Sequence, residues 1–84
     1  MHYVYILKLA NGSLYTGRSD NLKRRISEHM IGKVKSTAHK LPVNIIYYEA
    51  YLEKKDAINR ELFLKTGDGR QQIQRQLKST LLRD

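Results

Sequence analysis

The alternation of apolar and polar residues divides the chain into short strand-like and helix-like segments. Residues 3–9 are apolar, aromatic and β-branched, which is typical of a strand. Asn11-Gly12 follows and predicts a hairpin, because both residues accept positive φ. Residues 13–17 are then the partner strand. Residues 43–51, rich in Ile and Tyr, predict a third strand.

Three further segments have helical spacing. We expect helices over residues 21–31, with Ser19 or Asp20 as the cap, over 53–65 and over 71–82. The apolar residues available for packing are Leu22, Ile26 and Met30 in the first helix, Ala57, Ile58, Leu62 and Leu64 in the second, and Ile73, Leu77 and Leu81 in the last. The glycine-rich segment 66–69 is expected to end the second helix, and the basic segment 32–42 reads as a loop.

The resulting order, ββαβαα, predicts one α+β domain over residues 1–84, with a small three-stranded antiparallel sheet flanked by helices. The chain has no cysteine, which excludes disulfides and thiolate metal sites. The N-terminal sequence does not resemble a signal peptide, and no apolar stretch approaches the roughly 20 residues of a membrane span. We therefore expect a cytoplasmic protein that does not contact membranes.

Charge points to a polyanionic partner. The net charge is +8, and in residues 18–40 seven bases against two acids give +5. A basic field of this strength favours nucleic acid, although it can also be a solubilising surface. The exposed-looking lysines of the basic loop, Lys33, Lys35 and Lys40, are the first candidates for contacts with phosphate.

Two tyrosines, an arginine and a histidine form the most informative group. Tyr5 lies in the first strand and Tyr15 in its hairpin partner, so the two can meet across the sheet, although aromatic pairs in sheets are usually only packing. Arg25 and His29 are four residues apart and therefore share one face of a helix, along the edge of its apolar stripe. Together these groups can hold a phosphate and move a proton.

Glu61 is a carboxylate within an apolar arc of the second predicted helix, between Ala57 and Leu64. Such a group is costly unless it is paired or binds a cation. One interpretation is a salt bridge with Arg60, Lys65 or Arg25. The other is a ligand for a hard divalent cation such as Mg²⁺, which needs few protein ligands because it keeps several waters.

These segments resemble the GIY-YIG nuclease superfamily. Tyr3-Val4-Tyr5 followed by Tyr15-Thr16-Gly17 is similar to its two-part hallmark, residues 20–29 to its arginine- and histidine-bearing helix, and Asn59-Arg60-Glu61 to the helix with its metal-binding glutamate. The resemblance runs in order from residue 3 to about residue 70 and is greatest to small stand-alone bacterial members.

The resemblance implies a role for each matching residue. Tyr5 would act as general base or position the attacking water, and Tyr15 would line the scissile phosphate. Arg25 would stabilise charge on the phosphate, and His29 would relay a proton or orient Tyr5. The remaining implied residues are Glu61 as ligand of Mg²⁺ or another divalent cation, Gly17 as a point of close backbone approach, and Arg18 as a phosphate contact.

The chain departs from the family pattern in three places. Tyr3-Val4 stands for the first Gly-Ile, and Thr16 for the second Ile. The asparagine that many members carry beyond the glutamate is not evident in residues 65–70.

The sequence thus predicts a metal-dependent phosphodiesterase acting on nucleic acid, with a DNA endonuclease favoured. A free tyrosine has a pKa near 10, so we expect Arg25 or the cation to lower that of Tyr5. The alternative is a nucleic-acid-binding module on the same scaffold with little or no cleavage.

Overall fold

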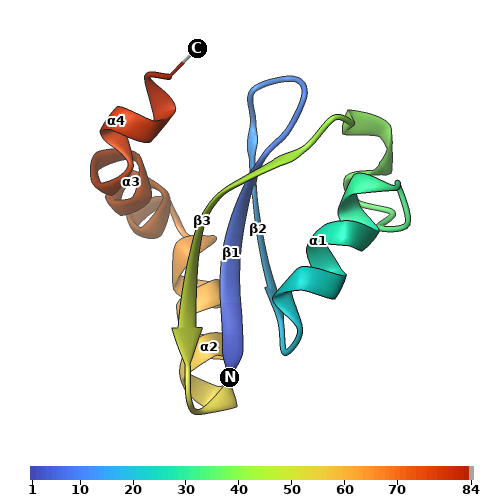
Figure 1. The fold of residues 1–84 in the computed structure, drawn as a ribbon. Coiled ribbons are helices and arrows are strands. Elements are labelled where there is room, and N and C mark those ends of the chain that lie inside the picture. The colour runs from blue at the N-terminus through green and yellow to red at the C-terminus, as the bar shows by residue number, and fades with distance from the viewer. Residues whose placement is uncertain (84) are drawn as a thin grey trace.

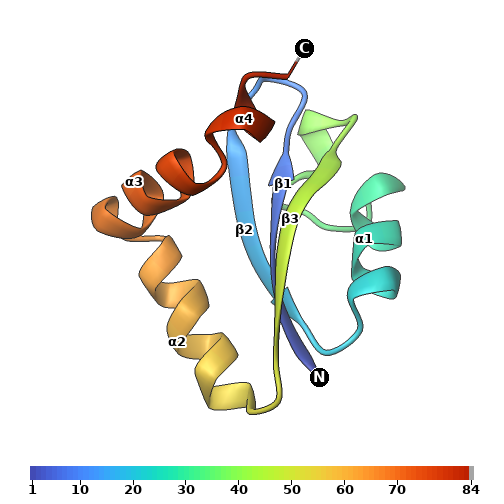
Figure 2. The same cartoon turned by 60° about the vertical axis from the view of Figure 1, so that its left-hand side comes forward.

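A computed structural model describes residues 1–83 of the chain. Helices lie on both faces of a central sheet, with α1 on one side and α2, α3 and α4 on the other (Figures 1 and 2). The elements are β1 (His2–Lys8), β2 (Leu14–Ser19), α1 (Leu22–Met30), the 3₁₀ turn η1 (Ala38–Lys40), β3 (Asn44–Tyr51), α2 (Lys54–Leu64), α3 (Gly67–Gln76) and α4 (Lys78–Leu81).

The sheet is antiparallel, with strand order β2-β1-β3. β1 is central, and β2 is an edge strand. The predicted α+β class, with a three-stranded antiparallel sheet in the order ββαβαα, is confirmed. No helix among residues 1–83 is long and apolar enough to span a bilayer.

Side-chain alternation along β1 gives the sheet two buried faces. Val4 and Ile6 point to α2 and α3, where they pack with Leu64 and Ile73. Tyr5, Leu7 and Leu9 point to the opposite face, where Leu22 and Ile26 of α1 cover them. Tyr5 therefore alternates along β1 with Val4 and Ile6, which belong to the larger core.

Two residues predicted to pack are exposed. Met30 of α1 is 51% exposed, because His29 occupies the inward position at the end of that short helix and is fully buried. Leu62 of α2 is 60% exposed. The side of α2 that packs on the sheet carries Ala57 and Leu64, which are seven residues apart and buried, and Leu62 does not lie on that side.

The ends of the elements also differ from prediction. Asn21, not Ser19 or Asp20, caps α1, since its Oδ1 accepts a hydrogen bond from Arg24 N at 3.1 Å. In the hairpin Gly12 has φ +86°, whereas no residue other than glycine within 1–83 has positive φ. Asn11 therefore does not take the conformation expected of it, and the turn closes through Gly12 N to Leu9 O.

The last predicted helix begins earlier than expected and is divided. α3 starts at Gly67, because the Thr66 hydroxyl accepts from Gly69 N at 3.1 Å and so caps it. Gly69 belongs to the helix for a packing reason. A Cβ there would overlap the backbone of Phe63 and lie 2.7 Å from Leu64 Cα, so glycine permits the tight turn from α2 into α3. A break at Leu77 separates α3 from α4.

Candidate active site

The candidate site lies along β2, the exposed edge of the sheet. Tyr5 belongs to the central strand, but its ring crosses Gly17, the residue paired with it on β2. A Cβ at Gly17 would lie 2.5 Å from Tyr5 Cζ. Glycine at this position therefore allows a tyrosine of the central strand to bring its hydroxyl to the sheet edge. This contact is made by a side chain and differs from the close approach of backbone that the resemblance implied at Gly17.

His29 lies between the two tyrosines. Its Nε2 is 2.7 Å from the Tyr5 hydroxyl, and its ring centroid is 5.5 Å from that of Tyr5 and 5.3 Å from that of Tyr15. Tyr15 pairs with Leu7 on β1, so it is a diagonal neighbour of Tyr5 on the same face. The structure thus brings Tyr5, Tyr15 and His29 into one cluster.

Thr37, a residue absent from the sequence-based prediction, completes this cluster. Its hydroxyl is 2.8 Å from His29 Nδ1 and 3.5 Å from the Val34 carbonyl, and its side chain is fully buried. The Val34 carbonyl can only accept, so the Thr37 hydroxyl donates to it and accepts from Nδ1–H. His29 Nε2 then accepts from the Tyr5 hydroxyl.

Burial determines the protonation states of this pair. It raises the pKa of Tyr5 from 10.0 to about 12, although the Arg25 guanidinium beside the hydroxyl acts to lower it. Arg25 therefore acts in the expected direction, but the lost hydration of the phenolate outweighs the guanidinium, and the pKa lies above its usual value. Burial, and then Arg25, lower the pKa of His29 from 6.5. At neutral pH the phenol is protonated and the imidazole is neutral.

Arg25 and Glu61 approach the Tyr5 hydroxyl from opposite faces of the sheet. Arg25, on α1, pairs with Glu28 at 3.3 Å, and its side chain is 37% exposed. Glu61, on α2, is close enough to Tyr5 for its charge to raise the pKa of the phenol. The two charged groups near the Tyr5 hydroxyl therefore come from different helices, α1 and α2.

Glu61 is flanked by two cations. Arg18 Nε is 3.5 Å from one carboxylate oxygen and Lys65 Nζ is 3.2 Å from the other. Of the partners considered from sequence, only Lys65 pairs with Glu61. Arg18, for which a phosphate contact is predicted, has a buried Nε without a hydrogen-bond partner among the described residues.

The position of Glu61 depends on the rotation of α2, which a second polar cluster sets. Arg60 donates to both oxygens of Glu49 on β3, with two contacts of 2.9 Å, while Tyr47 and Tyr51 each donate to Glu49 at 2.6 Å. Although burial acts to raise the pKa of Glu49, these donors lower it overall. Arg60 thus ties α2 to β3, and its neighbour Glu61 reaches towards β2. This cluster was not predicted from sequence.

A divalent cation would have to be held by few protein ligands. No group of three or more His, Cys, Asp or Glu side chains within residues 1–83 is arranged to hold a metal. Glu61 is one hard oxygen donor at an open edge, which suits a cation that keeps most of its waters. Its contacts to Arg18 and Lys65 are long, and the Lys65 side chain is 51% exposed and can move aside. The donor chemistry fits Mg²⁺.

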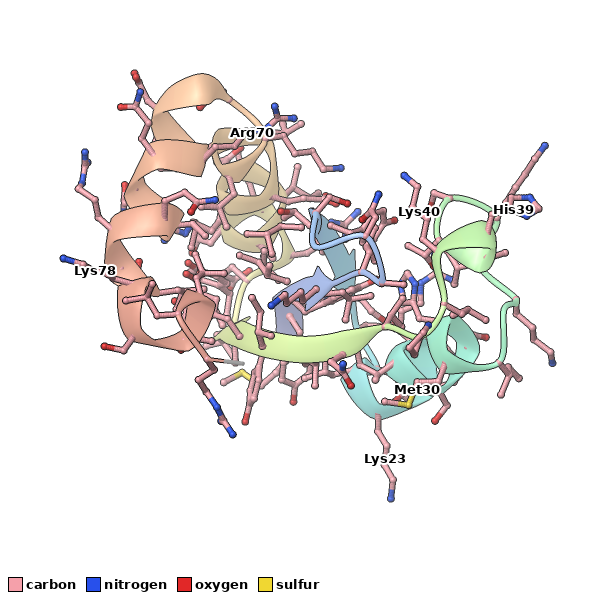
Figure 3. All side chains as sticks on the ribbon, turned by 90° about the horizontal axis from the view of Figure 1, so that it is seen from above. Lys23, Met30, His39, Lys40, Arg70 and Lys78 are labelled. Carbon is pink, nitrogen blue, oxygen red and sulfur yellow. The ribbon has the colours of Figure 1, made fainter. Side chains whose placement is uncertain are left out.

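The predicted lysines Lys33, Lys35 and Lys40 are exposed on the segment between α1 and β3. Figure 3 shows Lys40 on the side of the molecule where the β1–β2 hairpin and β2 lie, together with Arg70 of α3. Lys23 and Met30 lie on the opposite side, beyond β3 (Figure 3).

Comparisons with known proteins identify the family of the chain. The family model described as the GIY-YIG catalytic domain matches residues 1–74. A UPF0213 protein of Lacticaseibacillus paracasei is 42% identical over 65 residues, covering 76% of this chain and 73% of the relative. A UPF0213 protein of Staphylococcus haemolyticus is 41% identical over 73 residues, covering 86% and 89%.

A solved structure has the same fold. The solution NMR structure of a UPF0213 protein from Bacillus halodurans superposes with a TM-score of 0.56 at 35% identity, covering 86% of this chain and 80% of that one. Because the family model matches residues 1–74, nearly the whole chain, the chain belongs to the GIY-YIG family of nucleases.

Proposed function

We propose that the protein is a metal-dependent phosphodiesterase that cleaves nucleic acid, with DNA as the favoured substrate. One observation carries this proposal: the Tyr5 hydroxyl donates to a buried neutral His29 while the charges of Arg25 and Glu61 lie beside it. The basic net charge supports a polyanionic substrate.

The relay of hydrogen bonds suggests how water is activated. The Tyr5 oxygen has lone pairs that can accept a proton from the attacking water, and its own proton points to His29 Nε2. As the water oxygen bonds to phosphorus and the bond from phosphorus to the leaving oxygen breaks, the water proton passes to Tyr5 and the Tyr5 proton passes to His29. Tyr5 therefore acts without becoming a free phenolate, which its pKa of about 12 would disfavour at neutral pH.

The remaining residues stabilise charge. The Arg25 guanidinium is placed to neutralise the negative charge that develops on the non-bridging oxygens. Glu61 would hold the divalent cation, which when bound polarises the phosphoryl group and stabilises the leaving oxygen. Tyr15, beside the His29 ring, would orient the phosphate.

Cleavage of labelled duplex, flap, single-stranded and RNA substrates, with Mg²⁺ and with chelator, tests the proposal. Glu61→Gln should abolish cleavage and leave binding unchanged or tighter, because a negative charge near phosphate is removed. Arg25→Ala should reduce the rate by about a hundredfold or more and weaken binding moderately. Lys54→Ala, a change on the exposed start of α2, should cut like the parent.

Thermal melts of each variant separate loss of chemistry from loss of fold. A Glu61→Gln protein that folds normally and cuts as fast as the parent would contradict the metal assignment. The protein would then be a nucleic-acid-binding module, and the relay of Tyr5 and His29 would serve only structure.

A further inference from the structure

A groove lies next to the candidate site, between the β2 edge and helices α2 and α3. It encloses about 550 Å³, which is in the range for binding one small ligand. Its wall on one side is the hairpin and β2, residues 12–16, and on the other side it is formed by Lys65, Arg70 and Gln74. Its floor is apolar and belongs to the core.

The groove is continuous with the site. Tyr15 belongs to the β2 wall of the groove, while its ring lies on the other face of the sheet against His29, at 5.3 Å between ring centroids. Lys65 lines the groove and is 3.2 Å from the Glu61 carboxylate. A polymer whose phosphate reacts beside Tyr5 and Glu61 therefore has its next residue at the mouth of this groove.

The groove has two distinct parts that match a nucleotide. Lys65 and Arg70 provide positive charge at the rim, and Arg70 has no acidic partner within salt-bridge distance in the described part of the chain. Figure 3 shows Arg70 on the same side of the molecule as the hairpin. The half-buried Leu14 offers apolar surface to a base above the buried core residues of the floor, and the Gln74 amide can hydrogen-bond to the edge of the base.

We propose that this groove is a subsite for one unpaired nucleotide of the nucleic-acid strand, next to the reacting phosphate. This inference rests on the proposed function. Lys65 and Arg70 bind the flanking phosphate, and the base lies against Leu14 above the apolar floor. A base stacked and paired inside a continuous duplex cannot enter the groove, so single-stranded, frayed or branched substrates bind here in preference to intact duplex.

Titrations followed by NMR test the occupant. The full chain in EDTA is titrated with deoxythymidine 5′-monophosphate, with deoxyribose 5-phosphate and with inorganic phosphate. The nucleotide should shift the methyl signals of Leu14, Leu64 and Ile73, while the two phosphates without a base should shift only signals of the rim. Equal shifts from all three compounds, or no shift of these methyls, overturn the base subsite.

Binding of a labelled single-stranded oligonucleotide in EDTA tests the rim. Arg70→Ala should weaken binding about tenfold and reduce the slope of log affinity against log salt by about 0.7, the value for one phosphate contact on a single strand. Arg75→Ala removes the same charge from the same helix, but residue 75 does not line the groove. It should stay within about twofold of the parent, and equal losses from both variants contradict the subsite.

The two proposals fail separately. Methyl shifts without hydrolysis in Mg²⁺ contradict the nuclease function and support the subsite. Hydrolysis without methyl shifts supports the nuclease and overturns the subsite.

Discussion

At the scale of single residues, Thr37 determines what His29 can do. Because Thr37 accepts from Nδ1–H, the neutral imidazole keeps Nε2 free to accept from Tyr5. We expect the ring nitrogen shifts of His29 to show a proton on Nδ1 above its pKa. Thr37→Val should disturb this tautomer and cost roughly 1–3 kcal/mol, because a buried donor loses its partner. Thr37→Ser keeps the hydroxyl, so it should retain both the tautomer of His29 and the stability of the parent protein. A parent protein with the His29 proton on Nε2 would contradict the relay.

His29 also predicts how stability depends on pH. Burial lowers its pKa in the folded state below the ordinary value of 6.5, so between the two values the unfolded state binds more protons. The contribution of His29 to stability is thus present above pH 6.5 and is lost as the pH falls through the folded-state pKa. Urea titrations between about pH 7.5 and 5.5 should show a declining free energy of unfolding.

His29→Gln is the control for this pH dependence. It removes the titrating group, so the decline over the same range should largely disappear. An equal decline in the variant would assign the effect to other groups.

At the scale of elements, the position of α2 decides whether Glu61 reaches the β2 edge. Arg60 and Glu49 have side chains only 20% and 13% exposed. Arg60→Ala leaves the Glu49 carboxylate buried without its cation, which should cost roughly 3–5 kcal/mol. Arg75→Ala, on an exposed position, should change stability by no more than about 0.5 kcal/mol. Chemical denaturation measures both, and similar small losses would show that the pair does not anchor α2.

The turn from α2 into α3 gives a second prediction with a matched control. Gly69→Ala places a Cβ against the backbone of Phe63 and Leu64 and should destabilise by roughly 1–3 kcal/mol through overpacking. Gly67→Ala has open space around its Cβ and should be neutral or stabilising by up to about 1 kcal/mol. Thermal melts distinguish the two, and the opposite order would contradict the close contact at Gly69.

At the scale of the whole molecule, charge governs binding of nucleic acid. Replacing the exposed Lys33, Lys35 and Lys40 by Ala should weaken binding to all sequences alike and reduce the salt slope, by about 0.7–0.9 for each phosphate that is no longer neutralised. A matched triple variant at Lys54, Lys55 and Lys78 removes the same charge from helices on the other face of the sheet. Fluorescence anisotropy at several salt concentrations measures both, and equal effects would indicate attraction by net charge alone.

Local pattern was enough to predict the order and type of the main strands and helices, but not the cap of α1 or the break at Leu77, because periodicity depends on neighbours along the chain. The same reasoning placed Tyr5 and Tyr15 on one face of the sheet, and Arg25 and His29 on one face of α1. These relationships span only a few residues, and any fold that forms these elements preserves them.

Tertiary structure decided the rest, since burial depends on everything that packs around a group. Desolvation raises the pKa of Tyr5 where a neighbouring arginine predicts the opposite. Thr37 lies in an irregular segment, so no periodic pattern marks it as the partner of His29. Arg18 and Glu61 are 43 positions apart in the chain and meet only because α2 packs beside the β2 edge. The sequence by itself determined which groups are available for chemistry, and packing determined their protonation, partners and orientation.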